Sequence, residues 1–173
     1  MEFSKWLNES TVNDLYNSAV DAFPKTTLRQ HAIDPIRITQ LSIVPFKGMK
    51  TLYFKGLAQN EQRQYNPVIL FKGVEYQSAK LPNTIQITAD DGLVYNLNKL
   101  TTTNEVAVRC DCLDFYYRWN FTDWQDKSLY GRKRAKYESL GVGPPVNPTN
   151  SKGICKHLIK LIYAIKDSEL LTI

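Results

Sequence analysis

The sequence contains little cysteine, little histidine and no long apolar run. It has three cysteines and two histidines in 173 residues. An odd number of cysteines fits a disulfide framework badly, so we expect reduced thiols and folding in a cytoplasm. The most apolar stretch, Leu158 to Ile165, is interrupted by Lys160 and is far too short to cross a bilayer. The polar segment from Met1 to Leu15 is unlike a signal peptide. We therefore expect neither a membrane protein nor a secreted disulfide scaffold.

Motifs of the common enzyme classes are also lacking. The sequence has no nucleophile elbow, no H-E-x-x-H zinc motif and no dinucleotide-binding glycine pattern. The zinc deaminase signature requires His-x-Glu followed by Cys-x-x-Cys, and this is missing too. The acidic residues are scattered rather than paired for acid–base work. We therefore expect a protein that is not an enzyme.

What the chain does contain is enough apolar material for a core. Hydrophobic residues make up 43% of the sequence, and 173 residues suit one domain or one domain with a small appendage. The net charge of +5 favours acidic partners mildly. It does not distinguish nucleic acid from an acidic protein surface or from simple solubility, so the partner must be inferred from local patterns.

The spacing of apolar residues predicts a mixed α+β fold. Residues from Asn8 to Phe23 follow helical spacing and are followed by a proline. From Ile36 the period changes to two, and Asp90-Asp91-Gly92 forms a hairpin signal, so we expect an antiparallel meander of short strands. Ile154 to Ser168 again follows helical spacing. The expected division of this single compact unit is a helix and connector over 1–35, an antiparallel sheet over 36–105 and a third region over 106–173.

All three cysteines and one histidine fall into two short pairs, Cys110-Asp-Cys112 and Cys155-Lys-His157. Residues two apart in an extended strand point to the same face, so Cys110 and Cys112 can approach one ion while Asp111 points away. We expect Cys155 at or just before the first turn of the last helix, with His157 reaching the ion from that turn. Three thiolates and one imidazole predict one tetrahedral zinc site without an open position, and therefore a structural ion.

The predicted ion would join the end of the sheet to the last helix across the 42 residues 113–154. Closing so long a loop without a metal costs chain entropy, whereas structural zinc contributes on the order of 10 kcal/mol of apparent binding energy in small peptides. Two alternatives stay open at this point. The four residues could be ordinary buried cysteines and a surface histidine, or they could hold an iron–sulfur cluster with one histidine ligand.

Between the two pairs lie a dense aromatic block and a basic run. The aromatic block fills seven of the twelve positions from 113 to 124 with large side chains, namely Leu113, Phe115, Tyr116, Tyr117, Trp119, Phe121 and Trp124. We expect most of the block to pack over the zinc site, with Trp119 and Trp124 facing a partner. The basic run consists of Arg132, Lys133, Arg134 and Lys136. Phosphate contact, a solvated loop and contact with an acidic neighbouring protein all remain open for this run.

The order and setting of the two pairs resemble the SWIM-type zinc finger. In that family C-x-C follows a strand and C-x-H begins a helix, and the match here runs from Arg109 to about Ile165. The resemblance implies a SWIM-like zinc module that is closed by the last helix, with the two pairs as zinc ligands. The spacer of 42 residues is longer than the usual SWIM spacer, so the DNA binding proposed for that family does not transfer directly.

Six further stretches carry a second resemblance. They are Phe23-Pro-Lys-Thr-Thr, His31-Ala-Ile-Asp-Pro, Thr51-Leu-Tyr-Phe-Lys-Gly-Leu-Ala-Gln-Asn-Glu, Tyr65-Asn-Pro-Val-Ile-Leu-Phe-Lys, Cys112-Leu-Asp-Phe-Tyr-Tyr-Arg-Trp and Leu129-Tyr-Gly-Arg-Lys. Together they look like a small virion protein of myoviruses, particularly of marine and cyanobacterial tailed phages. The resemblance implies a structural component of the tail, baseplate or neck, assembled in the host cytoplasm with other virion proteins. The alternative is a nucleic-acid-binding zinc-finger protein.

Overall fold

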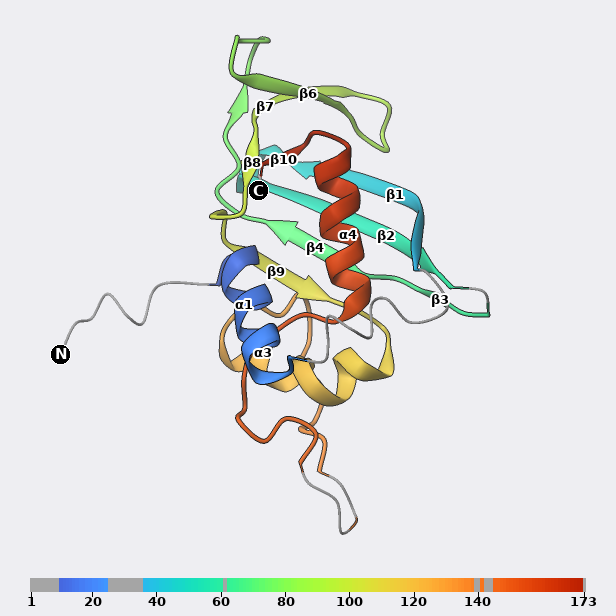
Figure 1. Ribbon diagram of the computed structural model, residues 1–173. Helices are drawn as coiled ribbons and strands as arrows, with labels where there is room; N and C mark the ends of the chain where they lie inside the picture. Colours follow the sequence, from blue (N-terminus) through green and yellow to red (C-terminus); the bar gives the residue numbers. More distant parts are fainter. Residues whose placement is uncertain (1–9, 25–35, 61, 139–140, 142–144, 173) are drawn as a thin grey trace, which may run out of the picture.

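Figure 1 shows a computed structural model of the chain, which describes residues 10–24, 36–60, 62–138, 141 and 145–172. The fold is mixed α+β with antiparallel sheets and a C-terminal helix, as the spacing of apolar residues predicted. The predicted helix start at Asn8 and the connector over 25–35, including His31, lie outside the described residues.

The central sheet is antiparallel and has the spatial order β1-β2-β4-β9. Its strands are β1 (Arg37–Phe46), β2 (Thr51–Gln59), β4 (Val68–Phe71) and β9 (Val106–Arg109), and the short β3 (Gln64–Tyr65) pairs with β2. One face is fully apolar at the paired positions Phe54, Ile69 and Val108, which are all completely buried. Along β2, the alternate positions Leu52, Phe54 and Ala58 are buried, as the period of two predicted.

The remaining strands do not continue this sheet. β5 (Tyr76–Gln77), β6 (Thr84–Thr88) and β7 (Val94–Asn98) form a separate antiparallel sheet in the order β5-β7-β6. β8 (Leu100–Thr101) pairs in parallel with β10 (Leu171–Thr172). The predicted single meander is therefore divided into two antiparallel sheets and a parallel pair. Alternating apolar residues show which face a side chain takes, but they do not show which strand lies alongside.

Both edges of the central sheet are occupied by other segments. On the outer edge of β1, the Ile43 amide donates to Asp90 Oδ1 (2.9 Å), and the Ile43 carbonyl accepts from the Asp90 amide (3.0 Å). Pro45, two residues further on, has no amide hydrogen to offer. On the opposite edge, the Val108 amide donates to the Ser128 carbonyl (2.7 Å). In the middle of each outer strand of the central sheet, the backbone amides and carbonyls therefore do not form a continuous free row.

Two longer helices complete the fold, one next to the start of β9 and one across the central sheet (Figure 1). α1 (Val12–Ala22) begins with a capping box in which Thr11 and Asp14 satisfy each other's backbone amides. α4 (Lys156–Asp167) crosses the apolar face of the central sheet. Its Leu161 packs so closely on β2 that a Cβ added to Gly56 would lie 3.0 Å from Leu161 Cδ1. α4 starts two residues later than the sequence predicted, because Cys155 is its N-cap.

The chain between the first cysteine pair and the Cys155–His157 pair contains helical turns that the sequence did not predict. A π-helical turn, η3 (Phe115–Trp119), leads directly into α3 (Asn120–Gln125). A short 3₁₀ turn, η2 (Lys47–Met49), also joins β1 to β2. The aromatic residues of the block have modest helix propensity and no clear helical spacing, so periodicity gave no helix there. η3 and α3 lie beneath the end of β9 (Figure 1), which brings the aromatic block next to the first cysteine pair.

Candidate metal centre

The two pairs that lie far apart in the sequence meet in one buried cluster. The Sγ atoms of Cys110, Cys112 and Cys155 and a ring nitrogen of His157 all lie within 4.8 Å of one another. All four side chains are buried, and none of the cysteines is in a disulfide. The structure thus shows that these residues form a compact cluster that could bind a metal ion.

Each pair is positioned by the backbone element that carries it. Cys110 and Cys112 follow directly after β9, and the Asp111 side chain points away to bond the backbone and side-chain nitrogens of Asn66 (both 2.8 Å). Cys155 has extended backbone angles as the N-cap of α4, and His157 is in the first turn. This is the arrangement that the spacing of the two pairs predicted.

The distances within the cluster fit a four-coordinate ion. His157 Nδ1 lies 3.8 Å from Cys110 Sγ and 3.9 Å from Cys155 Sγ. Tetrahedral zinc with ordinary bond lengths separates its ligand atoms by about 3.6–3.8 Å. These nitrogen–sulfur separations are long for a hydrogen bond but close to the edge of such a tetrahedron. The residues present therefore fit one metal ion.

The surroundings of the ligands favour anionic sulfur and a fixed imidazole. The Phe115 amide donates to Cys112 Sγ (3.3 Å), and the sulfur of Cys155 lies at the positive end of α4. The His157 ring packs on Tyr65 with ring centroids 4.4 Å apart. The buried Nε2 atom of His157 has no hydrogen-bond partner among the described residues, so packing rather than a hydrogen bond holds the ring.

Without a cation the cluster cannot hold three thiolates. Burial raises the pKa of the Cys155 thiol well above its usual value. A hydrogen bond from Cys110 lowers the pKa of Cys112, and the same bond raises the pKa of Cys110 because that thiol is the donor. These directions favour protonated thiols at Cys110 and Cys155 without a cation, and a divalent cation would release their protons as it binds.

The structure corrects one of the two predicted partner contacts in the aromatic block. Trp119 is completely buried, so it cannot face a partner. Its ring packs edge-on against Phe23 at 5.1 Å between centroids. Gly153 approaches it so closely that an added Cβ would lie 2.7 Å from the indole ring and 2.9 Å from the Ala19 side chain. Trp119 therefore anchors the chain just before the second ligand pair. Trp124 has 42% of its surface exposed and remains a candidate contact.

The predicted basic run is exposed and lies over the aromatic block. We call Arg132, Lys133, Arg134 and Lys136 the basic strip. The nearest cation–ring pairs are Lys133 above Trp124 (3.7 Å from Nζ to the ring centroid) and Arg134 above Tyr116 (4.9 Å from Cζ). Each such pair is worth about 0.5–1 kcal/mol at an exposed site. The strip is thus held against a defined surface instead of extending freely into solvent.

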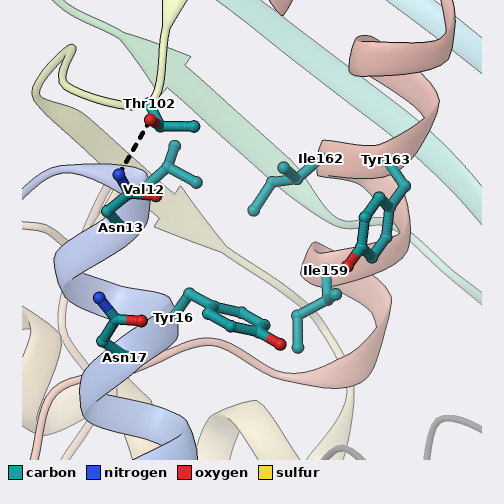
Figure 2. A pocket seen from close by; sticks show the side chains of 8 residues that line it. All are labelled: Val12, Asn13, Tyr16, Asn17, Thr102, Ile159, Ile162 and Tyr163. Atoms are coloured by element: carbon teal, nitrogen blue, oxygen red, sulfur yellow. Dashed lines mark hydrogen bonds between the residues drawn. The ribbon is translucent and has the colours of Figure 1, made fainter. Parts of the chain in front are cut away.

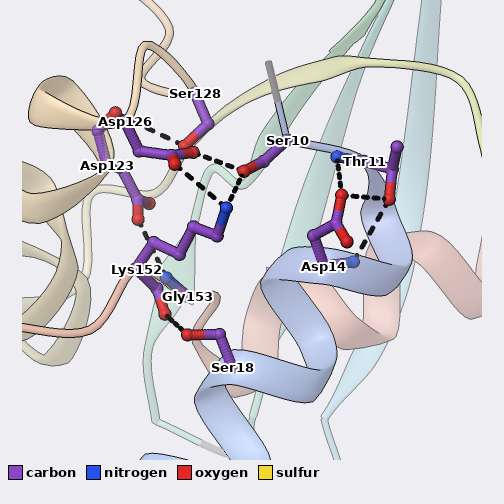
Figure 3. Close-up of polar contacts among 9 residues, drawn as sticks. All are labelled: Ser10, Thr11, Asp14, Ser18, Asp123, Asp126, Ser128, Lys152 and Gly153. Carbon is purple, nitrogen blue, oxygen red and sulfur yellow. Dashed lines mark hydrogen bonds and ion pairs between the residues drawn. The ribbon is translucent and has the colours of Figure 1, made fainter. Parts of the chain in front are cut away.

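A polar network that the sequence did not predict joins three segments (Figure 3). They are Ser10 before α1, the α3 helix with its end at Asp126, and the chain at 152–153 before Cys155. Lys152 Nζ pairs with Asp126 Oδ1 (3.0 Å), and both groups bond the hydroxyl of Ser10. Asp123, in α3, is completely buried and accepts a hydrogen bond from the Gly153 amide (2.9 Å). Its other oxygen has no partner among the described residues. An acidic residue inside an aromatic run was the one signal that could have indicated this buried carboxyl.

Replacement of Asp123 by Asn should change the pH dependence of stability. Burial raises the pKa of Asp123 well above 3.8, so its favourable contribution is present below about pH 4 and is lost as pH rises through the folded-state value. Asp123→Asn removes this loss while keeping the oxygen that accepts from Gly153. The unfolding free energy of the variant, relative to the wild type, should therefore rise from pH 4 upward by at most about 1.4 kcal/mol per pH unit.

Urea unfolding of both proteins between pH 4 and pH 8 tests this expectation. Protonation of the cysteine cluster is common to both proteins and cancels in the difference. A pH-independent difference would show that the Asp123 carboxyl is already ionised in the fold.

A cavity of about 230 Å³ between α1 and α4 lies apart from the cluster (Figure 2). Its lining residues are Val12, Asn13, Tyr16, Asn17, Thr102, Ile159, Ile162 and Tyr163. Asn13 Nδ2 bonds Thr102 Oγ1 (2.9 Å) at one end. The lining contains no cysteine, histidine or carboxylate, so this cavity offers no group for general acid–base work near neutral pH.

No helix in the described part of the chain has both the length and the apolar character needed to cross a membrane.

Comparisons of the chain with protein-family models, curated proteins and solved structures gave no significant match.

Proposed function

We propose that the cluster of Cys110, Cys112, Cys155 and His157 binds one structural zinc ion, and that the protein is a non-enzymatic component of an assembly. The observation that carries the proposal is the complete, buried set of four ligand atoms, all within 4.8 Å of one another. Three sulfurs and one nitrogen are ligands that zinc prefers. Four protein ligands leave no position for a reacting water, which supports a structural ion over a catalytic one.

Zinc suits the cluster better than an iron–sulfur cluster. The four ligand atoms surround a single point, whereas a cluster of two or more irons spreads its ligands over several metal atoms. Three thiolates with a divalent ion carry a net charge of −1, which the positive end of α4 offsets in part. The ion would join the end of β9, an outer strand of the central sheet, to the start of α4, the helix that crosses the apolar face of that sheet.

Metal analysis of the purified protein tests the zinc proposal. We expect one zinc ion per chain by elemental mass spectrometry. Substitution with Co²⁺ should give an intense thiolate-to-cobalt absorption typical of a tetrahedral site with three sulfurs. A chain that contains iron and inorganic sulfide instead would favour the iron–sulfur alternative, and a metal-free, fully stable chain would leave the cluster as ordinary buried thiols.

The assembly that we propose is the virion of a tailed phage, in the tail, baseplate or neck. This assignment is supported by the resemblance of the six sequence stretches to a small virion protein of myoviruses. Internal cross-linking by a metal also suits a small protein in a mechanically loaded particle. Other virion proteins would be its partners, and assembly would take place in the host cytoplasm.

Fractionation of purified particles tests the virion proposal. The protein should sediment with intact particles in a density gradient and should remain after a high-salt wash. Its appearance only in the soluble fraction of infected cells would argue against a structural role in the particle.

A further inference from the structure

We propose that the basic strip and the aromatic surface beside it bind single-stranded nucleic acid. This inference goes beyond the proposed structural role and does not depend on placement of the protein in a virion. It is carried by strip charges that have no acidic partner within the described part of the chain, by the way the strip backbone is held, and by a hollow that Lys136 lines together with three aromatic side chains.

The four cations of the basic strip have no acidic partner within the described part of the chain. The ion pairs there join Lys50 to Glu75, Arg118 to Asp114 and Lys152 to Asp126, and none includes a strip residue. All four strip residues are exposed. A solvated surface in a chain with 17 acidic residues normally mixes both signs of charge. A concentration of unpaired cations instead favours an anionic partner.

The backbone of the strip is held by side chains that lie next to the cluster of three cysteines and His157. Arg109, the residue before Cys110, donates through Nη1 to the carbonyls of Tyr130 (2.8 Å) and Arg132 (2.9 Å). Asn120 Oδ1 accepts from the Arg134 amide (2.8 Å). The backbone of the strip is therefore positioned before any partner binds, which lowers the entropy cost of binding.

A hollow of about 150 Å³ lies beside the strip, and we call it the aromatic hollow. Its walls include Tyr117, Phe121, Lys136 and Tyr137. The rings of Tyr117 and Tyr137 pack with centroids 4.3 Å apart, and both residues remain at least 36% exposed. A lysine that lines the same hollow as three aromatic rings suits a base and its adjacent phosphate.

This combination favours a single strand over a duplex. The aromatic faces can stack only on bases that are unpaired, and stacking tolerates any base sequence. A duplex would offer phosphates to the strip but would leave the hollow unused. An acidic protein surface would likewise satisfy the cations without filling the hollow, so the contribution of Tyr137 distinguishes these partners.

Fluorescence anisotropy with a labelled thymidine oligonucleotide tests the inference on the full, metal-loaded chain. We expect saturable binding at low salt that is tighter than binding of a duplex of equal length or of polyglutamate. The double variant Lys133→Glu/Lys136→Glu should weaken binding of the oligonucleotide at least about tenfold and flatten its salt dependence, since each phosphate contact contributes roughly 0.7 to the slope.

Lys80→Glu/Lys99→Glu is the matched control, because it makes the same charge change at exposed sites beside the separate three-stranded sheet. It should change affinity far less. Tyr137→Ala should weaken binding roughly five- to 150-fold by loss of stacking. Tyr163→Ala, at a tyrosine of similar exposure on α4, should leave affinity unchanged.

Equal losses in both charge variants, no effect of Tyr137→Ala, or no binding at low salt would overturn the inference. Binding of duplex or polyglutamate as tightly as the single strand would also overturn it and would identify a different partner class. Zinc content, measured in every variant, reports separately on the proposed structural ion.

Discussion

Cys155→Ser should abolish stoichiometric zinc binding and produce the largest loss of stability of any single substitution in this protein. The serine hydroxyl is nearly isosteric with the thiol, but it is a poor ligand for zinc at neutral pH. The substitution also leaves a buried polar group at the start of α4. Because structural zinc contributes on the order of 10 kcal/mol in small peptides, we expect a loss of several kcal/mol, enough to unfold the region that joins β9 to α4. Elemental analysis and thermal unfolding measure the two effects.

Leu158→Ala is the matched control for this prediction. Leu158 is completely buried on the same helix but offers no ligand atom. Its truncation should cost about 2–5 kcal/mol through lost packing, while zinc content stays at one ion per chain. A chelator should then lower the melting temperature of the wild type and of Leu158→Ala, and should have little effect on Cys155→Ser. Retention of zinc by Cys155→Ser would show that the cluster is not the site.

Trp119→Ala should destabilise the protein by about 3–5 kcal/mol, the usual cost of removing a large buried aromatic side chain. The indole ring fills the space between Phe23 and Gly153, so its removal leaves a cavity beside the segment that leads to Cys155. We therefore expect weaker zinc binding as well as lower resistance to urea. Unfolding in urea and a zinc competition titration with a chromogenic chelator measure these two effects.

Trp124→Ala provides the comparison within the same aromatic block. Trp124 is 42% exposed, and the Lys133 ammonium lies over its ring. Its loss should cost less than about 1 kcal/mol and should not alter zinc affinity. Similar losses in the two variants would contradict the contrasting burial of the two indoles.

The cluster could be predicted from the sequence because its geometry depends on local rules. Cys110 and Cys112 are two apart directly after a strand, and Cys155 and His157 lie at the start of a helix, so each pair converges without reference to the rest of the fold. The two pairs were expected to share one ion, because the chain has no other cysteine and only one other histidine. The helix of residues 156–167 and the alternation of burial in β2 were predictable for the same local reason.

The aromatic block could not be resolved in this way, because large side chains occupy more than half of its positions. With so many candidates, periodicity cannot separate Trp119, which is buried, from Trp124, which is exposed. The π-helical turn shifts the register further, since the Asn120 amide bonds back to the Phe115 carbonyl, five residues earlier. The anchoring of the basic strip by Arg109 was also hidden, because it depends on carbonyls more than twenty positions away.

The occupied edges of the central sheet have a consequence for how this protein can meet its neighbours. Asp90 and Pro45 close the middle of one outer strand, and Ser128 closes the other. A second molecule therefore finds no backbone template in the middle of either outer strand of this sheet, which removes one common route to strand addition there. At this sheet, contacts with a neighbour must instead be made by side chains. Such joints can change one residue at a time without disturbing the register of the fold beneath them.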